Sequence, residues 1–359
     1  MRRALRLAAR AHEATAPNPM VGAVLVRDDQ VVGEGYHRVA GGPHAEVLAL
    51  RAAGASTQGA TCYVTLEPCC HFGRTPPCTR ALIEAGVSRV VAAMADPFPR
   101  VSGGGVAELK RAGLSVEVGL LEPEARRLNA AYLKYVTQGL PYVTLKMAMT
   151  LDGKIASVTG DSQWITGERA RKAVHRWRSR SRAVMVGIGT ALADDPQLTA
   201  RLPGARNPTR VVVDARAELP LNSHIGRTLQ AVPTIVAASV AAPAIRREAL
   251  AAAGAHVLAL PERSGRTDLR ALMSELARLE LATVLVEGGA ELAAALLDED
   301  LVDRLIFFIA PKLLGGRAAP GPLGGEGLPL MGEARPVHDL TIRRYGPDIA
   351  LTAYVHRPG

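Results

Sequence analysis

The sequence predicts an α/β protein with two domains, and three observations support this. The chain has 359 residues, which is about twice the length of a typical domain. Hydrophobic residues make up 48% of the chain but aromatic residues only 4%, so its cores are expected to consist mainly of Ala, Val and Leu. Short apolar runs of β type alternate with helical patterns, which is typical of a layered α/β sheet.

The first part of the chain begins with a helical pattern, because Leu5, Ala8 and His12 recur at helical spacing. Two apolar runs joined by a short polar turn then predict a hairpin. Pro43 suits the first turn of the next helix and Gly54 suits its end. In order, the expected elements are a helix at 3–15, strands at 21–26 and 31–37, a helix at 43–53, a strand at 62–66, a helix at 78–86, a strand at 87–94, a helix at 106–112, a strand at 114–118 and a connecting helix at 128–137.

A domain boundary is expected at Gly139-Leu140-Pro141, where turn residues separate the two patterns. This predicts domains over residues 1–141 and 142–359. The second domain is richer in strand-like runs, and helical stretches separate them. The expected strands are 142–148, 183–187, 210–214, 234–238, 256–260, 283–287 and 305–311.

The formal charge of +9 comes from arginine, because six of the 43 basic residues are lysine and 43 − 6 leaves 37 arginines. Such a bias resembles a general compositional habit, with anionic small substrates as the alternative interpretation. The basic run from Arg176 to Arg182 is expected to form the solvated face of a helix, with Arg178 turned toward a substrate phosphate. Few aromatic residues lie nearby to stack on bases, so nucleic-acid binding is not expected.

No apolar run reaches the roughly 18 residues that a membrane-spanning helix needs, so no membrane contact is expected. Arg6 and Arg10 interrupt any signal-peptide core at the N-terminus. These observations predict a cytoplasmic protein.

All four cysteines lie between Cys62 and Cys78, which favours a metal site in a reducing compartment over a disulfide framework. A catalytic zinc takes three protein ligands and leaves one position open. His44, Cys69 and Cys78 are predicted to be these ligands, since adjacent Cys69 and Cys70 cannot readily point at one ion. Both chosen cysteines are expected near helix starts, where thiolates are favoured. Cys62 is expected in a strand and in the core, and Cys70 has no assigned role.

Glu46 follows His44 by two residues and is the expected proton carrier. A carboxylate in the first turn of the helix can take a proton from zinc-bound water and deliver it to a ring nitrogen and then to a leaving amine. This is hydrolytic deamination. The alternative is a closed zinc site without catalysis, in which Glu46 would have no role.

The motifs His44-Ala45-Glu46 and Pro68-Cys69 resemble those of the zinc nucleobase deaminases, which share an H-x-E and P-C-x-x-C signature. Here eight residues separate Cys69 from Cys78. Together with the motif at 18–23, that spacing is similar to the bifunctional deaminase and reductase family of riboflavin biosynthesis. The resemblance implies a cytidine-deaminase-like three-layer α/β/α domain and a phosphorylated pyrimidine substrate. It places Asn18 at the pyrimidine and His37, His71 and Arg74 at the ribose phosphate.

In the second half, Val286-Glu287-Gly288-Gly289 reads as a strand entering a glycine turn and then a helix at 291–297. Glycines allow close approach to a phosphate, and a helix N-terminus attracts it. Gly187-Ile188-Gly189 offers a second such turn. A Rossmann fold is not favoured, because Leu192 stands where that fingerprint needs a small residue.

The resemblance to the same family extends through this half, in the motifs at 145–154, 162–166, 189–196 and 286–289. It implies a dihydrofolate-reductase-like domain that uses NADPH to open the ribosyl ring to a ribityl chain, with Lys146 and Glu287 as the polar catalytic pair. Arg216 is a candidate for the 2′-phosphate of the cofactor. The implied substrate residues are Ser162, Arg178, Leu198, Arg201 and Glu287, and the implied cofactor residues are Ala148, Trp164, Thr190, Asp194, Gly289, Ala290, Glu291, Leu292, Ala293, Ala294 and Ala295.

These inferences predict a bifunctional riboflavin-biosynthesis enzyme with Zn²⁺ and NADPH, assembled as a homo-oligomer, a dimer or a tetramer. Two alternatives remain. One is a nucleic-acid or nucleoside deaminase with an accessory binding domain, which predicts affinity for RNA and no effect of NADPH. The other is a zinc-stabilised scaffold without catalysis.

Overall fold

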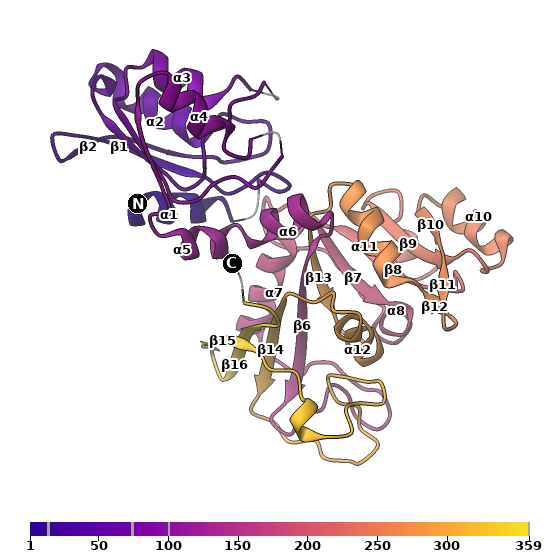
Figure 1. Cartoon of the computed structure of the whole chain (residues 1–359). Coiled ribbons are helices and arrows are strands. Elements are labelled where there is room, and N and C mark those ends of the chain that lie inside the picture. Colours follow the sequence, from indigo (N-terminus) through magenta and orange to yellow (C-terminus); the bar gives the residue numbers. More distant parts are fainter. Residues whose placement is uncertain (13–14, 73–74, 100, 358–359) are drawn as a thin grey trace. The chain divides into compact units, whose positions relative to one another are not determined.

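The computed structural model describes residues 1–12, 15–72, 75–99 and 101–357. Within these residues the chain forms two compact units, which divide between Leu140 and Pro141. No helix in the described residues is both long and apolar enough to cross a bilayer. Each unit has its own sheet and its own core (Figure 1).

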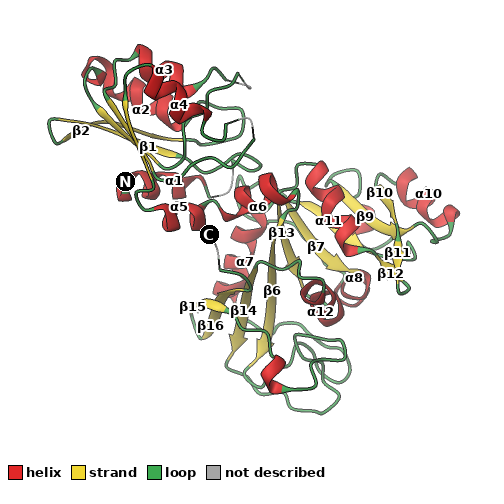
Figure 2. Ribbon diagram, viewed as in Figure 1, coloured by secondary structure: helices red, strands yellow, loops and turns green. Residues whose placement is uncertain are grey.

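The first unit is a five-stranded sheet with helices on both faces (Figure 2). Strand order is β2-β1-β3-β4-β5, with the β1–β2 and β1–β3 pairs antiparallel and the other two parallel. Helices α2, α3 and α4 cover one face, and α1 and α5 lie on the other. The elements are α1 (Arg2–Ala8), η1 (Ala9–Ala11), β1 (Gly22–Arg27), β2 (Gln30–Tyr36), α2 (Ala45–Ala53), η2 (Gly54–Thr57), β3 (Thr61–Val64), α3 (Cys78–Glu84), β4 (Arg89–Ala92), α4 (Gly104–Arg111), β5 (Ser115–Val118), α5 (Glu122–Leu128) and α6 (Ala130–Gln138).

Close packing of α2 on β2 depends on Gly35. A Cβ at Gly35 would lie 2.6 Å from the Cβ of Leu48 and 2.7 Å from the carbonyl oxygen of Ala45. Any side chain there would push α2 away from the sheet, because cores tolerate little overpacking. Gly35 therefore fixes the height of the helix whose first turn carries Glu46.

The second unit is built on a nine-stranded sheet of order β10-β9-β8-β7-β13-β6-β14-β16-β15. Its strands are parallel except at the β14–β16 and β15–β16 pairs. The strands are β6 (Tyr142–Thr150), β7 (Ala183–Gly187), β8 (Thr209–Val213), β9 (Thr234–Ser239), β10 (His256–Leu260), β11 (Glu262–Arg263), β12 (Arg266–Thr267), β13 (Thr283–Glu287), β14 (Arg304–Ala310), β15 (His338–Tyr345) and β16 (Asp348–Tyr354). The helices are α7 (Glu168–Arg180), α8 (Ile188–Asp194), α9 (His224–Arg227), α10 (Ala244–Ala252), α11 (Leu269–Arg278), α12 (Ala290–Asp298) and the short η3 (Met331–Glu333).

Most expected elements are present, but several bounds were wrong. The first helix ends at Ala8 and tightens into η1, and residues 13 and 14 of the expected helix lie outside the described residues. The expected strands at 62–66 and 87–94 are each four residues long. The turn expected at 187–189 is the start of α8, because Gly187 caps a helix there.

The sequence patterns missed α5 and the β15–β16 hairpin. The hairpin carries mixed polar residues on exposed positions of β15, so its alternation is too weak to predict a strand. The connecting helix expected at 128–137 corresponds to α6.

Candidate functional site

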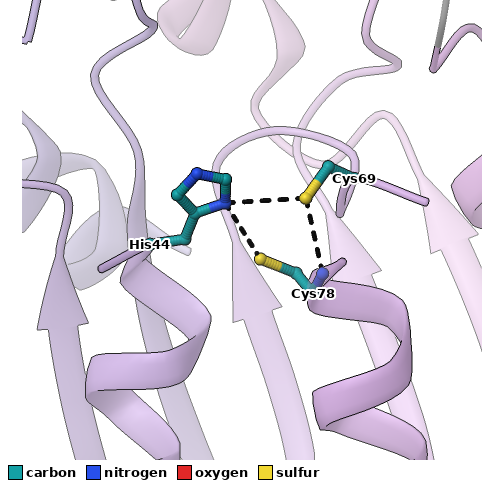
Figure 3. A group of neighbouring side chains, drawn as sticks. All are labelled: His44, Cys69 and Cys78. Carbon is teal, nitrogen blue, oxygen red and sulfur yellow. Dashed lines mark hydrogen bonds between the residues drawn. The ribbon is translucent and has the colours of Figure 1, made fainter. Parts of the chain in front are cut away.

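Three side chains from separate elements meet at one end of the first sheet (Figure 3). His44 caps the N-terminus of α2, Cys78 opens α3, and Cys69 lies in the loop after β3. Their candidate ligand atoms all lie within 4.8 Å of one another. The Nδ1 of His44 is 3.1 Å from the sulfur of Cys78 and 3.5 Å from that of Cys69. One imidazole and two thiol sulfurs form a donor set that suits zinc with one position left open.

The imidazole of His44 is oriented for a metal by Thr75. The Oγ1 of Thr75 lies 3.2 Å from the Nε2 of His44, on the side of the ring away from the cysteines. A proton on Nε2, donated to Thr75, leaves the lone pair of Nδ1 facing both sulfurs. Partners of this kind fix the tautomer of metal-binding histidines. The sequence patterns missed Thr75, although it is one of the eight residues between Cys69 and Cys78 that distinguish this motif.

Cys69 and Cys78 differ in acidity because they share one hydrogen bond. The Cys78 thiol donates to Cys69 and lowers the pKa of Cys69, while the same interaction raises the pKa of Cys78. The main-chain N–H of Cys78, at the start of α3, also points at the sulfur of Cys69 over 3.4 Å. The sequence suggested that Cys69 lies near a helix start, but the structure places it in a loop. It reaches the positive end of α3 across the site.

Glu46 lies buried beside the three candidate ligands, with 3% of its surface exposed. Its carboxyl group also lies within hydrogen-bonding reach of the Cys78 sulfur. Burial, and then the negative charge of Cys69, raise the pKa of Glu46 to about 7. A carboxyl group with such a pKa can both accept and release a proton near neutral pH.

Asn18 and His37 form a second polar group in this unit. The Nδ1 of His37 lies 3.1 Å from the carbonyl oxygen of Pro43, and the Nε2 lies 3.3 Å from the amide nitrogen of Asn18. In this arrangement Nδ1 donates and Nε2 accepts, so His37 is neutral, and burial also lowers its pKa. Both ring nitrogens of His37 are therefore engaged in this structure, and neither is left for the predicted contact with a phosphate. The Oδ1 of Asn18 takes no part in the hydrogen bond to His37.

The remaining residues of the expected phosphate site are partly placed. The rings of His71 and Phe98 are in contact at 6.2 Å between centroids. The Nδ1 of His71 is buried and has no partner within the described residues, and Arg74 lies outside them.

The sulfur of Cys70 would be 2.9 Å from a Cβ at Gly104, so Cys70 faces α4 and not the metal ligands. Cys62 is fully buried in the core, as expected.

In the second unit, parallel register pairs Lys146 of β6 with Glu287 of β13. The Nζ of Lys146 is 3.6 Å from the Oε2 of Glu287. Arg178 of α7 donates two hydrogen bonds to the same carboxylate, of 2.6 Å from Nε and 2.9 Å from a terminal nitrogen. Burial alone would raise the pKa of Glu287, but Arg178 and Lys146 hold it at about 2. Burial lowers the pKa of Lys146 in turn, which makes its proton easier to release.

The glycine turn after β13 lies next to α8. Gly288 and Gly289 have φ values of 75° and 83°, a left-handed backbone that favours glycine. A Cβ at Gly289 would lie 3.1 Å from the hydroxyl of Thr190. On the same helix, Asp194 accepts a 2.8 Å hydrogen bond from the hydroxyl of Ser162. The structure thus gathers several of the expected cofactor and substrate residues around α8 and the start of α12.

Comparison with known proteins identifies both units. Residues 141–351 match the model described as "RibD C-terminal domain", and residues 1–94 match the "Cytidine and deoxycytidylate deaminase zinc-binding region". The chain is 44% identical over 352 residues to the riboflavin biosynthesis protein RibD of Aquifex aeolicus, covering 98% of this chain and 96% of that protein. It is also 44% identical over 364 residues to RibD of Escherichia coli, covering 98% and 97%. The chain belongs to the RibD family.

Solved structures of RibD proteins share the whole fold. RibD of Acinetobacter baumannii matches with a TM-score of 0.88 at 42% identity, covering 98% of this chain and 97% of that one. The Thermotoga maritima protein, titled a diaminohydroxyphosphoribosylaminopyrimidine deaminase and 5-amino-6-(5-phosphoribosylamino)uracil reductase, matches with a TM-score of 0.82 at 36% identity, covering 99% and 97%. The expected fold, a cytidine-deaminase-like domain followed by a reductase domain, is confirmed.

Membership of the RibD family confirms the expected function. The chain is a bifunctional enzyme of riboflavin biosynthesis, a deaminase and a reductase, with Zn²⁺ and NADPH as cofactors. When bound, zinc activates water for attack and NADPH supplies hydride. The alternative of a nucleic-acid deaminase with an accessory domain is not favoured, because the second unit matches the RibD reductase domain.

The side chains of Leu198 and Arg178, two of the predicted substrate residues, are buried in the structure. Leu198 is only 2% exposed and packs in the core with Val184 and Val212, so its side chain does not face a substrate. Arg178 is buried and paired with Glu287, and its remaining nitrogen donates to the carbonyl oxygen of Thr199. It therefore does not lie on a solvated helix face.

The expected cofactor residues differ in whether their side chains are accessible to a ligand. Leu292, Ala293 and Ala294 are buried, so only the main chain of this turn of α12 can face a ligand. Trp164 is 60% exposed, with the guanidinium of Arg171 stacked 4.8 Å from its ring centroid. The other expected cofactor residues on these segments, Ala148, Ala290, Glu291, Ala295 and Arg216, are exposed or half-buried, as is the expected substrate residue Arg201.

Proposed function

We propose that the first unit, over residues 1–141, carries out the deamination, with His44, Cys69 and Cys78 as the zinc ligands and Glu46 as the proton carrier. The observation that supports this most directly is the buried carboxyl of Glu46 beside three converging ligand atoms. Glu46 takes one proton from the attacking water and gives it to the ring nitrogen; it then takes the second proton, from the newly added hydroxyl, and gives it to the amino group, which leaves as ammonia while the hydroxyl becomes the carbonyl. Its pKa of about 7 suits both transfers.

Recognition of the pyrimidine is assigned to Asn18, whose amide is held by His37. Since the nitrogen of that amide donates to His37, its oxygen is left to accept from a substrate N–H or amino group. His71 and Arg74 are assigned to the ribose phosphate. The buried Nδ1 of His71, which lacks a protein partner among the described residues, supports a ligand at that position.

The second unit, over residues 142–359, is proposed to reduce the ribosyl group of the deaminated product. Lys146 is the proton donor for opening the sugar, and Glu287 keeps the ammonium oriented. Arg201 and Ser162 contact the substrate phosphate. Burial, and then the charge of neighbouring Arg178, lower the pKa of Arg201. NADPH is assigned to Ala148, Trp164, Thr190, Asp194 and the main chain of the turn at 289–295. Arg216, three residues after the end of β8, is assigned to its 2′-phosphate.

The substrate is therefore a phosphorylated aminopyrimidine, and nucleic acid is not proposed as a partner. The test is to supply diaminohydroxyphosphoribosylaminopyrimidine with and without NADPH, and to follow ammonia release and NADPH oxidation. Ammonia is expected in both cases, and NADPH oxidation is expected to follow ammonia release. Absence of ammonia release, or RNA binding without any response to NADPH, contradicts the proposal.

The proposed location is the cytoplasm, because free thiolates as zinc ligands need a reducing compartment. Co-fractionation with a secreted or periplasmic marker would contradict this.

We also propose that the enzyme forms a homodimer through β15. This strand is an edge of the nine-stranded sheet, the position at which a sheet can be extended by a strand of a second chain. Leu340 and Ile342, two residues apart on this strand, are 57% and 68% exposed. A second copy that pairs at β15 would cover these apolar side chains in a self-complementary interface.

Ile342→Lys is expected to convert the assembly to a monomer, because a charged side chain would be buried without a partner in the proposed interface. Light scattering would then report a mass near 37.8 kDa, against twice that mass for the unaltered chain. Thr341→Lys, on the opposite face of the same strand, is the matched control and is expected to stay dimeric. A monomeric unaltered chain at micromolar concentration would contradict the proposal, and a tetramer would add a second interface.

A further inference from the structure

A long connection from β14 to β15 runs beside the turn that follows β6 in the second unit (Figure 1). Its first part, residues 312–325, is called the strap below. The strap is rich in glycine and proline and contains no helix or strand. Long loops without secondary structure inside a compact domain are commonly functional.

The strap is anchored at Asp152, in the turn after β6. The carboxylate of Asp152 accepts hydrogen bonds from the main-chain N–H of Leu314 (3.1 Å) and of Gly315 (2.7 Å). The hydroxyl of Thr150 donates a third, of 2.6 Å. The bond from Thr150, followed by that from Gly315, lowers the pKa of Asp152 to about 2, so this anchor stays ionised at neutral pH.

A second anchor follows two residues later. The Nζ of Lys154 donates a 2.9 Å hydrogen bond to the carbonyl oxygen of Ala319. The next residue, Ile155, donates its main-chain N–H to the carbonyl oxygen of Pro320 over 3.0 Å. The middle of the strap is thus held at two points by one short turn.

The far end of the strap rests on the first turn of α12. The N–H of Gly324 donates to the carbonyl oxygen of Ala290 at 3.0 Å, and that of Gly325 approaches a carboxylate oxygen of Glu291 at 3.4 Å. A Cβ at Gly324 would lie 2.3 Å from Oε1 of Glu291, so a larger residue there would displace the Glu291 side chain from the strap. At the near end, Lys312 donates a 2.7 Å hydrogen bond to the carbonyl oxygen of Trp164.

We infer that the strap is a wall of the NADPH site, and that Asp152 and Lys154 are positioning residues that hold it in place. The inference rests on the proposed cofactor role of Trp164, Ala290 and Glu291, which the strap contacts by hydrogen bonds. A glycine-rich wall beside a helix N-terminus suits a pyrophosphate-bearing cofactor, because main-chain N–H groups can come close to it.

Asp152→Asn tests the first anchor, since the carboxamide loses the charge and presents an NH₂ group or a single acceptor to two N–H donors. Losing charge-assisted hydrogen bonds of this kind is expected to raise the KM for NADPH about tenfold. The kcat at saturating NADPH and the rate of ammonia release are expected to stay within about twofold of the unaltered enzyme. Asp298→Asn, at the exposed last position of α12, is the matched control and leaves all three unchanged.

Lys154→Met tests the second anchor and keeps the aliphatic stem. It is expected to raise the same KM by a smaller factor, and the double variant is expected to show less than the product of the two effects, because both residues hold one strap. This variant also carries the test if the Asp152 variant does not fold. Full multiplicativity, or an unchanged KM in both single variants, would overturn the inference.

Hydrogen exchange locates the effect. NADPH is expected to slow amide exchange across 312–325 in the full-length enzyme, and Asp152→Asn is expected to speed exchange there before NADPH is added. Slower exchange at 289–295 with no change across 312–325 would show that the strap is not a wall of the site, and would overturn the inference. If NADPH slowed exchange at neither segment, the proposed cofactor residues themselves would be wrong, which is a separate result.

Discussion

Glu46→Gln is expected to reduce the kcat for ammonia release by about 10²–10⁴-fold, the range typical of a lost general acid–base group. Glutamine has nearly the same shape but cannot carry a proton, so the site should keep its packing. Zinc content is expected to be unchanged, because the ligand atoms come from His44, Cys69 and Cys78. NADPH oxidation with the deaminated intermediate is expected to proceed at the unaltered rate. Steady-state kinetics with each substrate and metal analysis of the purified variant check these outcomes.

The matched control for this prediction is Glu84→Gln. Glu84 lies on α3 in the same unit but is exposed and paired only with Arg80 in the described contacts. An exposed ion pair of this type contributes little, so both activities should remain. If Glu46→Gln released its zinc, or lost reduction as well as deamination, the assignment of Glu46 as a proton carrier in a separate site would fail.

Lys146→Met is expected to have the opposite pattern, with reductase kcat lowered by about 10²–10⁴-fold and ammonia release unchanged. Methionine fills a similar volume without the ammonium group. Glu287 would not be left alone, because Arg178 still donates two hydrogen bonds to it, which avoids the cost of an unpaired buried charge. The KM for NADPH should change little, since the proposed role of Lys146 is proton donation and not cofactor binding.

Lys172→Met is the matched control for that change, because Lys172 is exposed on α7 and pairs with Glu168 one turn away. Circular dichroism would confirm that both variants fold. A Lys146 variant with full reductase kcat would remove Lys146 from the mechanism. A raised KM for NADPH with normal kcat would instead assign it to cofactor binding.

The zinc site shows how far local patterns could lead. The helix start at Pro43-His44 and the cysteine at the start of α3 are local signals, and they placed two ligands on known helix ends. Adjacency argued against Cys69 and Cys70 as joint ligands, but the choice of Cys69 rested on an expected helix start, whereas the structure places Cys69 in a loop. Thr75 and the neutral state of His37 could not be found in this way, because each depends on a contact between segments distant in the chain.

Local sequence patterns predicted less of the reductase site. The sequence indicated Lys146 and Glu287 through a family resemblance, but the pairing of Glu287 with Arg178 joins residues 109 positions apart. The exposed strand β15 and the strap carry no strong periodic signal, and their positions follow from the strand order of the sheet.

The sequence alone determined the chemistry available to this protein: an imidazole, two thiols and a carboxyl group at deaminase spacing, and the α/β alternation of two domains. Only the tertiary structure decided which groups are neutral, which are paired and which are buried. The physical reason is range. Helix caps, turns and apolar periodicity act over a few residues, whereas hydrogen-bond partners and pKa values depend on strand order and register, which bring together side chains such as Lys146 and Glu287.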